Sequence, residues 1–309
     1  MPQINRASVP AFKEIELQVT SWCNRSCTFC AASRLELPKQ LMSMETAERI
    51  AGQLADIGFE GTIGLHLMCE PLLHKRFEDI VALFRAAAPK AFIRIDTNGD
   101  PLKSMERLHA CFEAGLNEVE INCYDSAEQF AQRNDGLRRL VQDHPGIWYW
   151  NASHTYPSTP RHTWRFIKMR AFWTGGFDLR NWAGLVPGAH DDELSFPLQL
   201  PCSRVTLRMH VNYLGQVILC NNDWTYAHVA ADLNTQDILD AWAAPMLEEY
   251  RARLTQRDRS LSPCDRCDDG YPRSREPGCP PSDGLVKVRR AWILGRRHLQ
   301  GFLAGRMKS

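Results

Sequence analysis

The sequence has no long apolar run and almost no net charge. No segment approaches the roughly 20 apolar residues that a membrane-spanning helix needs. The first residues, MPQINRASVPAFKE, also lack the apolar stretch of a secretory signal. We therefore expect a cytoplasmic protein without a transmembrane span. The formal net charge of +1 argues against a chain that binds polyanions over its whole surface.

We also expect no disulfide bonds, because cytoplasmic thiols are kept reduced. The chain nevertheless has 11 cysteines, and metal binding is the usual reason for so many in a reducing compartment. Hydrophobic residues make up 44% and charged residues 24% of the 309 residues, as in ordinary globular proteins. That length suffices for one large domain with an appendage, or for two domains.

The first part of the chain alternates short β-branched segments with longer amphipathic ones, the pattern of repeated βα units. Ser43 is the predicted N-cap of the first helix. About six such units predict an α/β fold whose parallel sheet curls into a partial (β/α)6 TIM-like barrel. The predicted strands are 14–20, 62–68, 92–96, 118–124, 147–153 and 177–184.

The composition changes after Trp182, where residues 185–201 are rich in proline, glycine and acids and read as a linker. Residues 205–213 and 216–223 then alternate like a β-hairpin with Leu-Gly at its turn. One helix is predicted over 235–257. We therefore predict three regions: a barrel at 1–190, a small hairpin and helix domain at 191–280, and a basic C-terminal helix or tail at 281–309.

A compact cysteine motif follows the first predicted strand: Cys23-Asn-Arg-Ser-Cys27-Thr-Phe-Cys30. Three thiolates on one short loop can bind three irons of a [4Fe–4S] cluster. The fourth iron then has no protein ligand, and an open coordination position is what metal chemistry requires. Structural zinc sites use four closed ligands, most often from C-x2-C pairs. The spacing therefore favours a catalytic iron–sulfur cluster.

The pattern C-x3-C-x-aromatic-C after the first strand of a βα repeat resembles the radical S-adenosylmethionine (SAM) superfamily. The resemblance implies that SAM chelates the open iron. An electron from a flavodoxin- or ferredoxin-like donor then cleaves SAM to methionine and a 5′-deoxyadenosyl radical, which abstracts a hydrogen from the substrate.

Other segments match the superfamily in sequence order and lie at predicted strand ends, where barrel enzymes keep their chemistry. Glu70 stands where relatives have a carboxylate for the SAM amino group, although Cys69 replaces their usual glycine. The resemblance implies further SAM-binding roles for Phe29 beside the adenine, Asn98 in Thr97-Asn98-Gly99, Asn122, and Arg133 at the SAM carboxylate.

A second set of cysteines is formed by two separated pairs. Cys202 and Cys220 flank the hairpin with Gly215 at its turn, and Cys264-Asp-Arg-Cys267 follows the helix. Four thiolates make a closed site that suits zinc or a [4Fe–4S] cluster, and the spacing leaves both open.

The arrangement C-x12-G-x4-C followed by C-x2-C resembles the SPASM/twitch family of auxiliary-cluster domains. The full SPASM pattern has seven cysteines. The chain keeps four of them and Cys279, which has too few companions for another cluster. The resemblance, which covers about residues 14–270, therefore implies the twitch form with one auxiliary [4Fe–4S] cluster.

The twitch layout is similar to that of dehydrogenases acting on aminocyclitol and aminosugar alcohols. It implies an oxidoreductase that oxidises a carbinol carbon of a small polar substrate, with the auxiliary cluster taking the second electron. Arg180, next to Asn181, is the candidate for orienting that substrate.

Three alternatives remain open at this stage. A radical epimerase would need a thiol hydrogen donor, for which we expect Cys123 to face the substrate, with Cys69 and Cys279 as further candidates. A second alternative is modification of a ribosomal peptide or protein side chain. The third is a non-enzymatic zinc- or nucleic-acid-binding protein, whose basic tail would contact an anionic partner such as lipid or RNA.

Overall fold

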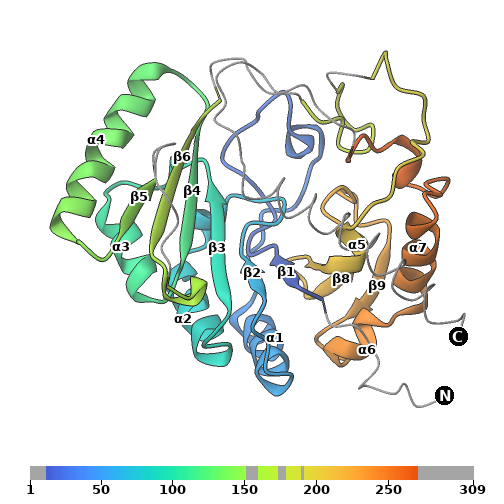
Figure 1. The fold of residues 1–309 in the computed structure, drawn as a ribbon, viewed down its shortest axis with the longest axis horizontal. Coiled ribbons are helices and arrows are strands. Elements are labelled where there is room, and N and C mark those ends of the chain that lie inside the picture. Colours follow the sequence, from blue (N-terminus) through green and yellow to red (C-terminus); the bar gives the residue numbers. More distant parts are fainter. Residues whose placement is uncertain (1–11, 151–158, 173–178, 189–190, 271–309) are drawn as a thin grey trace, which may run out of the picture. The chain divides into compact units, whose positions relative to one another are not determined.

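The computed structural model describes residues 12–150, 159–172, 179–188 and 191–270 (Figure 1). In this part of the chain nine strands form one sheet in the order β5-β6-β4-β3-β2-β1-β7-β8-β9. Neighbours from β5 to β7 are parallel, and β8 is antiparallel to β7 and β9. The strands are β1 (Glu14–Leu17), β2 (Thr62–Gly64), β3 (Phe92–Thr97), β4 (Glu118–Cys123), β5 (Trp148–Trp150), β6 (Phe166–Ala171), β7 (Arg208–Val211), β8 (Gln216–Ile218) and β9 (Val229–Asp232).

Helices alternate with the first four strands, which confirms the predicted parallel α/β architecture and partial barrel. The Ser43 side chain accepts a hydrogen bond from the Thr46 N–H at 3.0 Å and so caps the first helix as predicted. The helices of this region are α1 (Met44–Asp56), α2 (Phe77–Ala87), α3 (Glu106–Glu113) and α4 (Ala127–Asp143). None of the described helices is both long and apolar enough to cross a bilayer.

The last barrel strand differs from the prediction. It is formed by β6, which inserts between β4 and β5, whereas 177–184 was expected. The described part of that segment is a turn with positive φ at Trp182, Ala183 and Gly184. An extended strand excludes such angles. Residues 151–158, between β5 and β6, lie outside the described part of the chain.

The predicted hairpin is present, and Gly215 at its turn has φ +83°. Its first strand, however, pairs in parallel with β1, so the hairpin extends the barrel sheet. The helix predicted over 235–257 is two helices, because Pro245 begins a new one. The helices of this region are α5 (Arg204–Leu207), α6 (Ile238–Trp242) and α7 (Pro245–Thr255). Cys279 and the basic segment 281–309 lie outside the described residues.

The two faces of the parallel strands carry different chemistry because side chains alternate along a strand. Apolar side chains such as Ile15, Ile95 and Ile121 are fully buried and belong to the main hydrophobic core, which includes residues of α1, α2 and α3. The alternate positions carry charges, for example Glu16 and Asp96, and these face the interior of the partial barrel. The barrel thus has an apolar outer side under the helices and a charged inner wall.

Candidate active site

A cavity of about 550 Å³ lies at the C-terminal ends of the parallel strands. Its size is typical of sites for small molecules. Residues that follow or end β1, β2, β3, β4 and β6 line it, so several strands contribute side chains to one space. This is the edge at which barrel enzymes gather their functional groups.

Cys23, Cys27 and Cys30 all line this cavity from the loop after β1. The Cys30 N–H donates to the Cys27 carbonyl at 3.0 Å, and the Arg25 N–H donates to the Cys23 sulfur at 3.5 Å. Burial raises the pKa of Cys30 to about 11, with smaller contributions from the charges of Cys27 and Cys23.

These thiols therefore lie within electrostatic reach of one another at a single cavity. No three ligand side chains of the described residues converge on one point as they would around a single ion. In an iron–sulfur cluster, separate thiolates bind separate irons. The three cysteines fit such a cluster because they line one cavity and because the charges of Cys23 and Cys27 raise the pKa of Cys30.

Glu70 lies at the cavity wall after β2 and is 2% exposed. Its carboxylate accepts hydrogen bonds from the Thr97 hydroxyl at 2.6 Å and from the Asn98 N–H at 2.7 Å. The Leu72 N–H donates to it at 3.1 Å. Burial raises its pKa to about 7, against these three hydrogen bonds, which favour the ionised form. A fixed carboxylate with a near-neutral pKa suits a cationic ligand group.

The other predicted SAM-binding residues differ in what they contact. Asn122 and Phe29 line the cavity, and the Asn122 Oδ1 is buried without a partner among the described residues. Asn98 also lines it, with its amide nitrogen 2.8 Å from the Asn24 Oδ1. Arg133 is not among the lining residues, because its guanidinium donates to the Asn98 carbonyl at 2.7 Å and to Asp100 at 2.8 Å. In this structure Arg133 supports the loop after β3.

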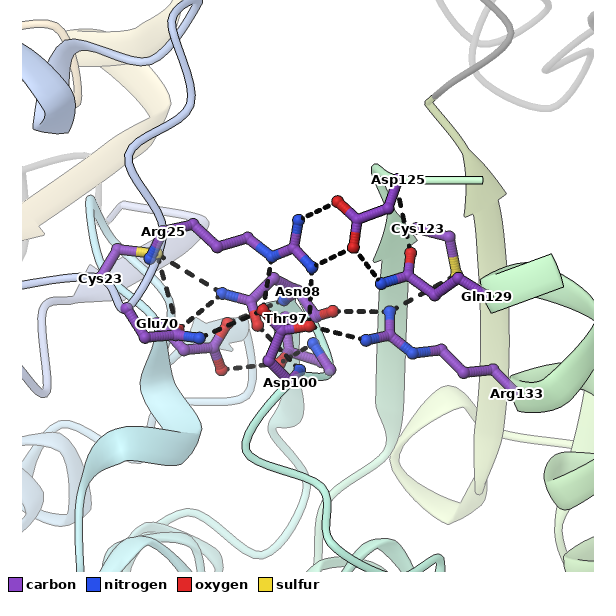
Figure 2. A network of polar contacts seen from close by, with 12 residues as sticks. Cys23, Arg25, Glu70, Thr97, Asn98, Asp100, Cys123, Asp125, Gln129 and Arg133 are labelled. Atoms are coloured by element: carbon purple, nitrogen blue, oxygen red, sulfur yellow. Dashed lines mark hydrogen bonds and ion pairs between the residues drawn. The ribbon is translucent and has the colours of Figure 1, made fainter. Parts of the chain in front are cut away.

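The expectation that Cys123 faces the substrate is wrong. Cys123 is fully buried in the main hydrophobic core and does not line the cavity, whereas its neighbours Asn122 and Tyr124 do. The cause is the alternation of side chains along β4. Figure 2 shows the Cys123 sulfur pointing toward Arg133 of α4, whose guanidinium lies 3.5 Å away.

An ion-pair network surrounds the first cysteine loop, and no sequence pattern indicated it. Arg25 lies between the first two cysteines and contacts Asp100 after β3 and Asp125 after β4 (Figure 2). Asp100 in turn accepts from Asn24 at 3.2 Å and from Arg133 at 2.8 Å. The loop that carries the cysteines is therefore tied to two neighbouring strand ends.

Charged residues of the inner barrel wall form the floor of the cavity. His66 Nε2 lies 3.7 Å from the Asp96 carboxylate, and this carboxylate accepts a hydrogen bond from Arg94 at 2.6 Å. Arg208 pairs with Glu16 at 3.2 Å. The sequence held a signal for this floor, since charged residues alternate with apolar ones in EIEL, FIRID and EVEINC. These groups can bind hydroxyl and amino groups of a polar ligand.

Arg180 lines the cavity, although it lies in a loop and not on the predicted strand. Arg180 pairs with Asp269, and Arg204 donates to the same carboxylate at 2.8 and 2.9 Å. Because the Asp269 N–H also donates to the Cys267 sulfur at 3.4 Å, this triad connects the cavity with the second set of cysteines. The neighbouring Asn181 is buried and accepts from the Asp268 N–H at 3.3 Å.

Each of the four cysteines of the second set lies within electrostatic reach of at least one other. Burial raises the pKa of Cys264 to about 12, and the charges of Cys267 and Cys202 raise it too. Burial also raises the pKa of Cys220, and the charges of Cys264 and Cys267 raise it further. Asn222 donates to two of the sulfurs, through its side chain to Cys267 at 3.0 Å and through its N–H to Cys220 at 3.4 Å. Such N–H···S bonds are typical of thiolates that bind iron–sulfur clusters.

Comparison with known proteins agrees with this arrangement. Residues 17–142 match the radical SAM superfamily, and residues 202–268 match SPASM, an iron–sulfur cluster-binding domain. Over 266 residues the chain is 26% identical to the S-adenosyl-L-methionine-dependent 2-deoxy-scyllo-inosamine dehydrogenase of Niallia circulans, covering 84% of this chain and 93% of the relative.

Two solved structures share the fold. The crystal structure of BtrN in complex with AdoMet and 2-DOIA has a TM-score of 0.64 and 23% identity, covering 86% of this chain and 97% of BtrN. BtrN in an open conformation has a TM-score of 0.60 and 20% identity, covering 84% and 94%. Together with the cysteine loop, the cavity and the second cysteine set, the family matches identify a radical SAM domain over residues 17–142 and a SPASM iron–sulfur cluster-binding domain over residues 202–268.

Proposed function

We propose that this radical SAM oxidoreductase oxidises a carbinol carbon of a small aminocyclitol- or sugar-like substrate to a carbonyl. The observation that carries the proposal is the connection of both cysteine sets to one cavity. The first set lines the cavity, and Arg180 and Arg204, which also line it, bind the Asp269 carboxylate beside Cys267. The curated relative acts on 2-deoxy-scyllo-inosamine, as its name states.

The cysteines bind the two clusters, and the cavity residues bind SAM. When bound, SAM and the two clusters supply hydrogen-atom abstraction and an acceptor for the remaining electron. Glu70 holds the amino group of SAM, since its carboxylate is fixed by three hydrogen bonds. The proposed cluster ligands are Cys23, Cys27 and Cys30 for the first cluster and Cys202, Cys220, Cys264 and Cys267 for the auxiliary one, with Phe29, Asn98 and Asn122 around SAM.

The charged floor orients the substrate and takes up its hydroxyl proton. Oxidation of a carbinol removes a hydrogen atom from carbon, a proton from oxygen and one electron. His66 lines the cavity, and its Nδ1 is buried without a partner among the described residues. With Asp96 near its other nitrogen, His66 is the group that we propose as proton acceptor. Arg180 orients a substrate oxygen.

A small electron carrier of the flavodoxin or ferredoxin type is the proposed electron donor, because a low-potential cluster must be reduced before SAM is cleaved. We further propose that the enzyme works in the cytoplasm, where its cysteines stay reduced. Contact of the basic tail with an anionic partner stays a prediction, because residues 271–309 lie outside the described part.

The test is anaerobic turnover of the reconstituted enzyme in deuterated water. SAM, a reductant and 2-deoxy-scyllo-inosamine are supplied first, followed by other amino- and hydroxycyclitols. We expect 5′-deoxyadenosine and a ketone product in equal amounts. The Cys264→Ala/Cys267→Ala variant is the control, and it should cleave SAM without forming ketone. An epimerised product that carries solvent deuterium at carbon would contradict the proposal.

A further inference from the structure

Arg259 is a buried cation that forms no ion pair with a carboxylate in the part of the chain that the structure describes. It follows α7 in the sequence and is 2% exposed. Its guanidinium donates to three backbone carbonyls, those of Leu200 at 2.9 Å, Cys267 at 3.2 Å and Pro201 at 3.3 Å. No carboxylate of the described residues forms an ion pair with it. Buried charges are normally paired or bound to a metal centre, because the loss of hydration is costly.

The surroundings of Arg259 are the second set of cysteines. One of its carbonyl partners belongs to Cys267 itself, and another belongs to Pro201, which precedes Cys202. Burial raises the pKa of Cys264 and of Cys267, and the positive charge of Arg259 acts in the opposite direction on both thiols. The guanidinium is therefore fastened to both cysteine-bearing segments and lies within electrostatic reach of the thiols.

A cluster held by four thiolates is an anion, since the thiolates carry more negative charge than the iron–sulfur core carries positive charge. We propose that Arg259 is the buried counter-cation of the auxiliary cluster. The inference rests on the proposed assignment of the four cysteines to that cluster, and it does not depend on the identity of the substrate.

Two consequences follow from simple electrostatics. Without the cluster the buried charge of Arg259 is only partly balanced, because Asp269, whose pKa Arg259 lowers, already pairs with Arg180 and Arg204. With the cluster it gains a counter-charge. Reduction adds a negative charge to the cluster, so a nearby fixed positive charge favours the reduced state and raises the reduction potential. Arg204 is not equivalent, because Asp269 already pairs with it through two hydrogen bonds.

The first test compares unfolding of the protein with and without its clusters for Arg259→Met. We expect this variant to be at least as stable as the wild type without clusters, and less stable than the wild type with clusters. Arg257→Met is the matched control, because Arg257 lies two residues away and is exposed. If Arg259→Met loses stability equally in both states, or fails to fold without clusters, Arg259 serves only to join the two segments and the proposal is overturned.

The second test is a redox titration followed by electron paramagnetic resonance, in a Cys23→Ala/Cys27→Ala background that retains only the auxiliary cluster. At a fixed potential we expect Arg259→Met to lower the ratio of reduced to oxidised cluster about tenfold, which is about 59 mV for one electron. Arg259→Lys keeps the charge and should stay near the wild type. Equal behaviour of Arg259→Met and Arg257→Met would overturn the proposal.

The iron content distinguishes a wrong assignment of the auxiliary cluster from a wrong role for Arg259. In the same background, Cys264→Ala/Cys267→Ala should remove the remaining iron. If that iron is retained, the assignment of the auxiliary cluster fails, and the inference on Arg259 falls with it. If the iron is lost and Arg259→Met leaves the potential unchanged, the cluster assignment stands and the role of Arg259 alone is refuted.

Discussion

Arg25 and Asp100 are joined by two side-chain contacts, with Arg25 Nε 2.5 Å from Asp100 Oδ2 and Arg25 Nη2 2.8 Å from Oδ1. The same guanidinium binds the Asp125 carboxylate at 2.6 and 2.8 Å. A planar guanidinium can bind two carboxylates in this bidentate way, and an ammonium group cannot. The loop with the first three cysteines is thus held by the protein itself, through residues on two neighbouring strand ends.

Replacing Arg25 with Lys should weaken retention of the first cluster. Hydrogen bonds to charged groups contribute roughly 1.5–3 kcal/mol, and partial exposure of Asp125 places this network at the lower end, so iron loss to a chelator should be about tenfold faster. The rate is measured by anaerobic chelation of the reconstituted protein. Arg49→Lys, at an exposed i,i+4 pair with Glu45, is the control and should match the wild type. An unchanged rate in Arg25→Lys would show that the network does not hold the loop.

SAM should bind more tightly as the pH rises through about 7. Glu70 has a pKa raised to about 7 by burial, so it is largely neutral below that value and charged above it. Only the charged carboxylate pairs with the SAM amino group, and the bound cation in turn lowers the carboxyl pKa. Affinity is measured anaerobically from about pH 6 to 8 on the reconstituted enzyme. Glu70→Gln should bind weakly and lose this dependence, whereas a flat profile in the wild type would exclude the proposed role.

Cys123→Ala should keep its turnover. The thiol is buried in the core away from the cavity, so its removal should cost about 1 kcal/mol of stability and leave product formation within a few-fold of the wild type. Cys111→Ala is the matched control, since Cys111 is also a fully buried core thiol. Both are tested by thermal unfolding and by anaerobic product analysis. A selective loss of product in Cys123→Ala would mean that this thiol reaches the substrate.

Two glycines with positive φ should respond differently to alanine. At Gly58, with φ +58°, an added Cβ has no heavy atom within 4 Å, so only the backbone cost of about 1 kcal/mol is expected. At Gly215, with φ +83°, the Cβ would lie 2.6 Å from Asn234 Nδ2 and 2.9 Å from Thr46 Cγ2. Gly215→Ala should therefore cost about 2 kcal/mol or more. Denaturant unfolding measures both, and equal losses would show that Asn234 and Thr46 move aside.

The sequence alone indicated the elements whose signals are local. Hydrophobic periodicity placed the first four strands and helices, Ser43 was identified as a cap, and Gly215 marked the hairpin turn. The cysteine spacings indicated the family resemblance and the cofactors, through Cys23, Cys27 and Cys30 and through the two later cysteine pairs. Each of these features depends on residues close together in the chain, so a single sequence suffices to see them.

Only the tertiary structure decided which side chains meet. The direction of Cys123 depends on which face of β4 turns inward, and a displacement of one residue reverses that face. Arg25 finds its carboxylates 75 and 100 residues away, and Arg259 gathers carbonyls from residues up to 59 positions earlier. Such contacts form when strand ends and loops that are distant in the sequence come together, so no local sequence pattern predicts them.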